Sequence, residues 1–135
     1  PGESVSQLIG KYEPSPLVKA IAPDTAGFLY IDRERFHEVF AHDVPPVEAQ
    51  VMAVTQKPAN SVTFEQSVES AAWQTIPSWY LLAQEDRAIP PELQRFMSSR
   101  MGAKTTEIKS SHVPYISQPK EVANLIMEVA SFAVA

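Results

Sequence analysis

The composition of this 135-residue chain is that of a single ordinary globular domain, with 44% hydrophobic and 20% charged residues. Its formal net charge of −5 disfavours nucleic acids and anionic membranes as partners, because both select clustered lysine and arginine. The absence of cysteine excludes disulfides, thiol nucleophiles and thiolate metal sites. The three histidines, His37, His42 and His112, follow no metal-binding spacing, so we expect no zinc site.

The chain has no apolar run long enough to cross a bilayer and no signal peptide, so a cytoplasmic location is the default expectation. It begins with Pro1 rather than methionine, in the loop-like tetrapeptide PGES. This beginning indicates a piece cut from a longer chain.

The first half of the chain is predicted to hold a loop followed by a small helical unit. Proline and glycine are frequent near the start, so residues 1–15 are expected to be a loop. A short helix over residues 16–21, with Ser15 as its cap, and a short strand over residues 28–31 come next. Residues 16–74 as a whole are predicted to form a helical unit without a long strand.

Two amphipathic helices are expected inside this unit. The first begins at Asp32, and the second follows Pro46 and ends at Pro58. The apolar positions at helical spacing are Phe36, Val39 and Phe40 in the first helix and Val47, Val51 and Val54 in the second. Residues 59–74 are polar with some helical character, so their structure is left open.

Residues 75–135 are predicted to form a strand, a helix, a second strand and a second helix. The apolar run SWYLLA is typical of a strand buried on both faces, and the more polar KTTEIK, residues 104–109, is typical of a strand near an edge. Pro91 and Gly102 mark the ends of the first helix, and Pro119 opens the last one. The apolar faces of the two helices are Leu93, Phe96, Met97 and Met101, and Val122, Leu125, Ile126 and Val129. This order implies parallel strands in an α/β fold.

Two polar residues directly follow the two predicted strands. Asp86 comes after the first and His112 after the second, and the carboxyl ends of parallel strands meet at one edge of a sheet. Such a carboxylate can hold one imidazole nitrogen and leave the other free as a general base. Alternatively, Asp86 merely caps a turn, His112 is structural, or the adjacent Glu85 takes the acidic role.

The segments EDRAIPPELQRFM and SSHVPYISQP resemble the C-terminal part of α/β-hydrolase fold enzymes, and within them the lineage of methylesterases and hydroxynitrile lyases. The matching positions are Glu85-Asp86, Ile89-Pro90, Leu93-Gln94-Arg95-Phe96 and Ser111-His112-Val113. The resemblance is strong over residues 76–130 and weaker over residues 16–70, which would correspond to the family's helical cap. It implies a Ser-His-Asp triad with Asp86 as the acid and His112 as the base.

The nucleophile that the resemblance requires has no counterpart in the chain. None of the four glycines, at positions 2, 10, 27 and 102, flanks a serine in a GxSxG elbow. Ser110 and Ser111 lie beside His112 in sequence but have no elbow. The resemblance therefore places the serine in a missing N-terminal half of the fold, and this chain is not expected to be catalytic alone.

The resemblance also favours a reaction and a substrate class. The lyases carry a lysine directly after the histidine, whereas this chain has Val113, which favours hydrolysis of a small apolar carboxylic ester. Hydrolysis of this kind implies no cofactor and no metal. Four aromatic residues are candidates for an apolar substrate pocket, although plain core positions are the more common use of such residues: Phe36, Phe40, Trp73 and Trp79. The expected macromolecular partner is the N-terminal half or a second copy.

Two other classes of function stay open. The chain is either an inactive fragment or a binding and assembly half, because an unpaired strand edge and an uncovered apolar face drive association. A pocket that senses a ligand without turnover is the third alternative.

Overall fold

The computed structural model describes residues 2–133, so the expectation drawn from Pro1 concerns a residue outside the described part. In chain order the elements are α1 (Val5–Ile9), the 3₁₀ helix η1 (Val18–Ala20), β1 (Ile21–Pro23), β2 (Phe28–Ile31), α2 (Phe36–Phe40), α3 (Pro46–Thr55), β3 (Ala59–Asn60), α4 (Val62–Glu65), the 3₁₀ helix η2 (Ala72–Gln74), β4 (Trp79–Ala83), α5 (Pro91–Met101), β5 (Lys104–Ile108), α6 (Pro114–Ser117) and α7 (Pro119–Ala133).

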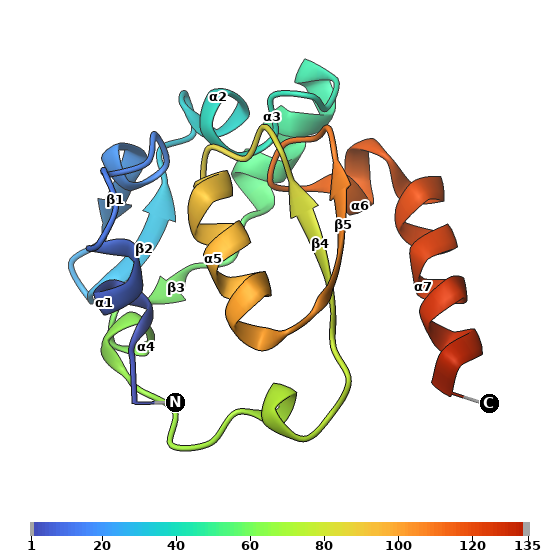
Figure 1. The fold of residues 1–135 in the computed structure, drawn as a ribbon. Coiled ribbons are helices and arrows are strands. Elements are labelled where there is room, and N and C mark those ends of the chain that lie inside the picture. The colour runs from blue at the N-terminus through green and yellow to red at the C-terminus, as the bar shows by residue number, and fades with distance from the viewer. Residues whose placement is uncertain (1, 134–135) are drawn as a thin grey trace.

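The strand, helix and strand over residues 79–108 fold in the order that the sequence predicts. Strands β4 and β5 pair in parallel, with Trp79 opposite Lys104 at one end and Ala83 opposite Ile108 at the other. Helix α5 is the crossover between them, and α5 and α7 flank the two strands on opposite sides (Figure 1). Gly102 ends α5 with a φ of 62°, a left-handed conformation in which glycine carries no steric penalty. Because β4 and β5 are parallel, their carboxyl ends lie at the same edge of the sheet.

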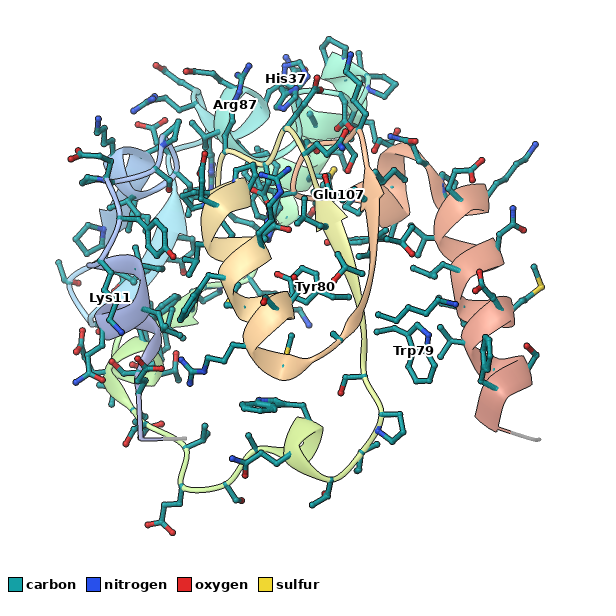
Figure 2. All side chains as sticks on the ribbon, viewed as in Figure 1. Lys11, His37, Trp79, Tyr80, Arg87 and Glu107 are labelled. Atoms are coloured by element: carbon teal, nitrogen blue, oxygen red, sulfur yellow. The ribbon has the colours of Figure 1, made fainter. Side chains whose placement is uncertain are left out.

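The small sheet is only partly covered. Leu82 and Ala83 are buried, but the rest of β4 is half-buried and most of β5 is exposed. Figure 2 shows Trp79 pointing towards α7, while Tyr80 lies on the side of α5. The indole Nε1 of Trp79 is buried without a hydrogen-bond partner among the described residues. The prediction that this strand is buried on both faces therefore holds only at its carboxyl end.

The first half of the chain contains a three-stranded antiparallel sheet, of which the sequence predicts only β2. The order is β1, β2, β3, and the pairing includes Ile21 opposite Ile31 and Leu29 opposite Ala59. The hairpin between β1 and β2 closes because Asp24 Oδ1 accepts the N–H groups of Ala26 and Phe28, at 2.8 and 2.9 Å. We call residues 16–74 the cap segment; it is a mixed unit rather than a helical one.

The N-terminal residues are also more ordered than predicted. Helix α1 lies within residues 1–15, which were expected to be a loop. Its first turn is a capping box, in which Ser4 and Gln7 each accept the other's backbone N–H. The helix expected over residues 16–21 is reduced to η1, and Ile21 already begins β1.

The apolar stripe predicted for α3 is wrong. Val47, Val51 and Val54 are exposed, at 73%, 56% and 60% of their surface, whereas Ala49 and Ala53 are buried. Alanine lets α3 approach the rest of the cap segment closely, and the buried cluster there consists of Phe36, Ala41, Val44, Ala49, Ala53 and Val113. Val113 brings the segment after β5 into the same core as the cap segment.

The last part of the chain forms two helices instead of the one predicted. A short α6 precedes α7. Of the apolar face predicted for α7, Val122, Leu125 and Val129 are half-buried, whereas Ile126 is exposed. Phe96 on α5 is likewise exposed, although Leu93 on the same helix is buried. Within residues 2–133, no helix combines the length and the apolar character that a membrane span requires.

Candidate active site

Asp86 lies at the carboxyl end of β4, in a buried position. Its Oδ1 accepts the backbone N–H groups of Ala88 and Ile89 at 2.7 and 3.0 Å. Its Oδ2 accepts the amide N–H of Gln94 at 2.9 Å and the Nδ1–H of His112 at 2.8 Å. Asp86 therefore caps a turn and also contacts the histidine, so capping the turn does not exclude the predicted contact. Four donors fix the plane of the carboxylate.

His112 lies after β5, at the same sheet edge as Asp86. Because its Nδ1 donates to the Asp86 carboxylate, its Nε2 is the unprotonated nitrogen of the neutral ring. Within the described residues Nε2 has no hydrogen-bond partner, and the side chain is 28% exposed. The ring of Phe40 packs on the imidazole, with ring centroids 4.7 Å apart. This arrangement leaves one nitrogen able to take a proton from a group outside the described chain.

The neighbouring acidic and phenolic groups do not compete for the histidine. Glu85 is exposed and forms an ion pair with Lys109 at 3.6 Å. Burial, and then the negative charge of Asp86, raise the pKa of the Tyr80 phenol, so Tyr80 stays neutral. Ser110 and Ser111 are buried, and their hydroxyls bond to the nearby backbone, at Ser111 O and Val113 N. Among the described residues, Asp86 is thus the acidic group that bonds to His112.

Gln94 is a supporting residue to which the sequence assigned no role. Its side chain is buried, accepts the N–H of Ala83 at 3.1 Å, and donates to Asp86 Oδ2 and to Ile89 O. The glutamine therefore ties the end of β4 to the loop that carries Asp86. The only signal in the sequence was its place within the motif that carries the family resemblance.

Replacing Gln94 by leucine is expected to lower the free energy of unfolding by about 2 to 3 kcal/mol, because it leaves the buried N–H of Ala83 without a partner. Urea unfolding of the chain measures this change. The matched control is Gln50→Leu on the exposed part of α3, which is expected to change stability by less than about 0.5 kcal/mol. Equal effects of the two substitutions would contradict the supporting role of Gln94.

A cavity of about 460 Å³ lies in the cap segment beside the histidine. Phe40 separates the two, since its ring packs on His112 and also lines the cavity. The lining is mostly apolar: Leu17, Ile21, Leu29, Tyr30, Ile31, Phe36, Phe40, Met52, Thr55, Gln56, Lys57, Ala59 and Phe64. The structure thus brings two of the four candidate pocket aromatics, Phe36 and Phe40, to this cavity.

The other two candidates, Trp73 and Trp79, lie elsewhere. Trp73 lines a separate cavity of about 290 Å³ together with Tyr80 and Met97. Trp79 lines a third cavity, of about 260 Å³, against α7, and its ring centroid lies 6.1 Å from that of Phe132. Neither tryptophan borders the cavity beside His112. Elsewhere in residues 2–133, no three His, Asp or Glu side chains gather in a way that could hold a metal ion.

Residues 5–125 match the sequence model of the alpha/beta hydrolase family. The chain belongs to this family. The predicted α/β-hydrolase fold is therefore confirmed. No match was found among the curated proteins.

Two solved structures are similar to this member of the alpha/beta hydrolase family. A pyrethroid hydrolase from Sphingobium faniae JZ-2 is 28% identical, with a TM-score of 0.75 over 97% of this chain. Polyneuridine aldehyde esterase is 14% identical, with a TM-score of 0.74 over 95% of the chain, and shows the shared fold alone. The chain spans 56% of the length of each of these structures.

Proposed function

We propose that this chain carries the acid and the base of a Ser-His-Asp triad in an esterase. The observation that carries the proposal is the 2.8 Å hydrogen bond between His112 Nδ1 and Asp86 Oδ2. In addition, Nε2 has no hydrogen-bond partner within the described residues, on a side chain that is 28% exposed. Membership of the alpha/beta hydrolase family supports it, as does similarity to a pyrethroid hydrolase. The reaction needs no cofactor, because its groups are a hydroxyl, an imidazole and a carboxylate.

In this mechanism His112 Nε2 removes the proton of a serine hydroxyl as the serine oxygen attacks the ester carbonyl carbon. The imidazolium that forms is stabilised by the ionised Asp86, and it then gives its proton to the departing alcohol. In the second half of the reaction, water loses a proton to Nε2 as it attacks the acyl carbon. The bond to the serine oxygen then breaks, the carboxylic acid leaves, and Nε2 returns the proton to the serine oxygen. The four donors on Asp86 hold the carboxylate still while charge develops on the imidazole.

The serine in this proposal comes from a segment other than residues 1–135, because the chain has no GxSxG elbow. We name that part the nucleophile segment and call its combination with this chain the active assembly. Co-expression of this chain with a strand-GxSxG-helix segment of the same fold is expected to give hydrolysis of short aryl esters, and neither part alone is expected to do so. Turnover by residues 1–135 alone, or none by the active assembly, would contradict the proposal.

The cavity beside Phe40 is the proposed site for the apolar part of the ester. Its volume of about 460 Å³ and its apolar lining suit a substrate group larger than the small ester expected from the sequence. A polar rim of Thr55, Gln56 and Lys57 belongs to the same lining. The proposed roles of Phe36 and Phe40 are to shape this cavity, with Phe40 next to the base.

The substitution Thr55→Trp narrows the cavity. It is expected to raise KM by about tenfold for an aryl ester with a bulky acyl group and to leave KM unchanged for the acetate ester of the same phenol. Thr55 is exposed at the end of α3, so the larger side chain fits without disturbing the buried cluster. Steady-state kinetics of the active assembly with both esters test this. The control is Thr63→Trp, an exposed position on α4 outside the cavity lining. A change in KM for both esters alike would argue against the cavity as the substrate site.

Within the family we propose the methylesterase and lyase lineage, with hydrolysis rather than cyanohydrin cleavage. The support is the apolar Val113 directly after the histidine, whose side chain is fully buried in the core of the cap segment. An apolar side chain in that position carries no positive charge to stabilise a departing cyanide.

The second candidate is a non-catalytic half that binds another chain. It is favoured by the uncovered sheet, since the edge of β4 away from β5 has no strand partner among the described residues. Several large apolar side chains are also exposed, among them Ile126, Met127 and Phe132 on α7. Stable assembly with a partner but no ester turnover would favour this candidate.

A further inference from the structure

A corner of the cap segment, residues 41–44, contacts both loops that carry the Asp86–His112 pair. Asp43 Oδ2 accepts the backbone N–H of Ser111 at 2.9 Å, directly before His112. His42 Nε2 lies 3.0 Å from the carbonyl oxygen of Glu85, directly before Asp86. Nearby, Arg87 Nη1 donates to Glu38 O at 3.0 Å, and Figure 2 shows Arg87 beside α2 at the top of the view. The corner thus lies where the two loops meet.

His112 is held to the cap segment on both sides along the chain. Ser111 is buried, and its backbone N–H donates a hydrogen bond to the Asp43 carboxylate. Val113 is fully buried among Phe36, Val44 and the other members of the cap cluster. The residues before and after the histidine are therefore anchored, one by a hydrogen bond to a carboxylate and the other by packing.

We propose that Asp43 is a positioning residue for His112, acting through the backbone amide of Ser111. This inference rests on the proposed function, because positioning matters only if His112 works as a base. Asp43 supplies the polar half of the anchor. Without it, the loop before the histidine loses its fixed register, and Nδ1 no longer stays aligned on Asp86 Oδ2. Losing that alignment lowers turnover rather than substrate binding.

The charge state of Asp43 suits this role. Burial raises the pKa of the Asp43 carboxyl. Hydrogen bonds from the hydroxyl and amide of Ser111 and from the hydroxyl of Ser117 together lower this pKa by more than burial raises it, so the pKa lies below its ordinary value. The carboxylate is therefore ionised throughout the pH range in which an imidazole titrates. A charged acceptor holds the Ser111 N–H more strongly than a neutral one.

The kinetic test is Asp43→Ala in the active assembly, with ester hydrolysis as the readout. We expect kcat to fall by about 10- to 100-fold while KM stays within about twofold. Asp43→Asn keeps a side-chain oxygen for the Ser111 N–H and is expected to keep kcat within about threefold of the wild type. Equal losses for alanine and asparagine, or a change in KM alone, would overturn the positioning role.

The matched control is Asp24→Ala. Asp24 is another exposed aspartate of the cap segment, and it accepts two backbone N–H groups in the hairpin between β1 and β2. Its loss is expected to lower stability as much as the loss of Asp43 without changing kcat. If both alanine variants reduce kcat alike, Asp43 only stabilises the cap segment and the proposal fails.

A second measurement uses this chain alone and does not depend on turnover. The His112 Nδ1–H resonance in the proton NMR spectrum is expected at low field in the wild type, Asp43→Asn and Asp24→Ala, and to be broadened by exchange with water in Asp43→Ala. An unchanged signal in Asp43→Ala would overturn the proposal. If His112→Ala leaves turnover intact, the proposed function fails. If His112→Ala abolishes turnover while Asp43→Ala keeps full activity, only the positioning role fails.

Discussion

Replacing His112 by alanine is expected to lower kcat of the active assembly by about 10⁴-fold or more, because the serine then has no base and the leaving alcohol no acid. The substitution removes both functions of Nε2, which has no partner within the described residues. KM for a short aryl ester should stay nearly unchanged, since the cavity beside Phe40 is not lined by His112. Steady-state hydrolysis of that ester is the measurement.

The control for this variant is His37→Gln. His37 lies on α2 and donates from Nε2 to the carbonyl oxygen of Val44 at 2.9 Å, so a glutamine amide can make the same bond. Its kcat is expected within about twofold of the wild type. A residual activity of the His112→Ala assembly close to that of His37→Gln would mean that the base lies elsewhere.

Replacing Asp86 by asparagine is expected to lower kcat by about 10³- to 10⁴-fold, because it changes the tautomer of His112. The backbone N–H groups of Ala88 and Ile89 both donate to Asp86 Oδ1, so the asparagine is expected to place its oxygen at that position. Its NH₂ group then faces Nδ1 of the histidine, which must become the acceptor. The proton moves to Nε2, and the ring can no longer accept one from the serine.

The same substitution also sets the asparagine NH₂ group against the amide N–H of Gln94, so it should destabilise the chain by about 1 to 3 kcal/mol. The control is Glu85→Gln, because the Glu85 carboxylate is exposed and, within the described residues, pairs with Lys109 alone. We expect its kcat and stability to match those of the wild type. Turnover and urea unfolding measured together test both effects, and a wild-type kcat in Asp86→Asn would contradict the acidic role.

The part of the fold around the Asp86–His112 pair was predictable because strong local signals mark it. Pro91 and Gly102 bound α5, and a strand on each side of that helix leads to parallel pairing. Asp86 and His112 then meet at one edge, since each directly follows a strand. The lack of a GxSxG elbow is equally visible in the sequence.

The packing of α3 was not predictable from its apolar pattern. The helix carries valine, alanine and methionine on several faces, so size rather than hydrophobicity decides which face is buried. The close approach of the cap cluster selects Ala49 and Ala53, and the larger valines are left outside. Side-chain volume matters only once the neighbouring helix is in place.

The long-range contacts around the pair carry no local signal at all. Asp43 and Ser111 are 68 positions apart, and nothing in either neighbourhood indicates that they meet. The two-residue strand β3 likewise exists only through its pairing with β2. The hairpin turn at Asp24 and the capping box of Ser4 and Gln7 are different, since both have recognisable sequence patterns that the expected loop and helical unit left out.

The most direct measurement of the central claim is labelling of the active assembly with a fluorophosphonate, followed by peptide mass spectrometry. Because His112 and Asp86 are proposed to activate a serine that this chain lacks, the label is expected on a serine of the nucleophile segment. Labelling should slow by about 10³-fold or more in the His112→Ala assembly. A label on a serine within residues 1–135, or a labelling rate that His112→Ala leaves unchanged, would contradict the account.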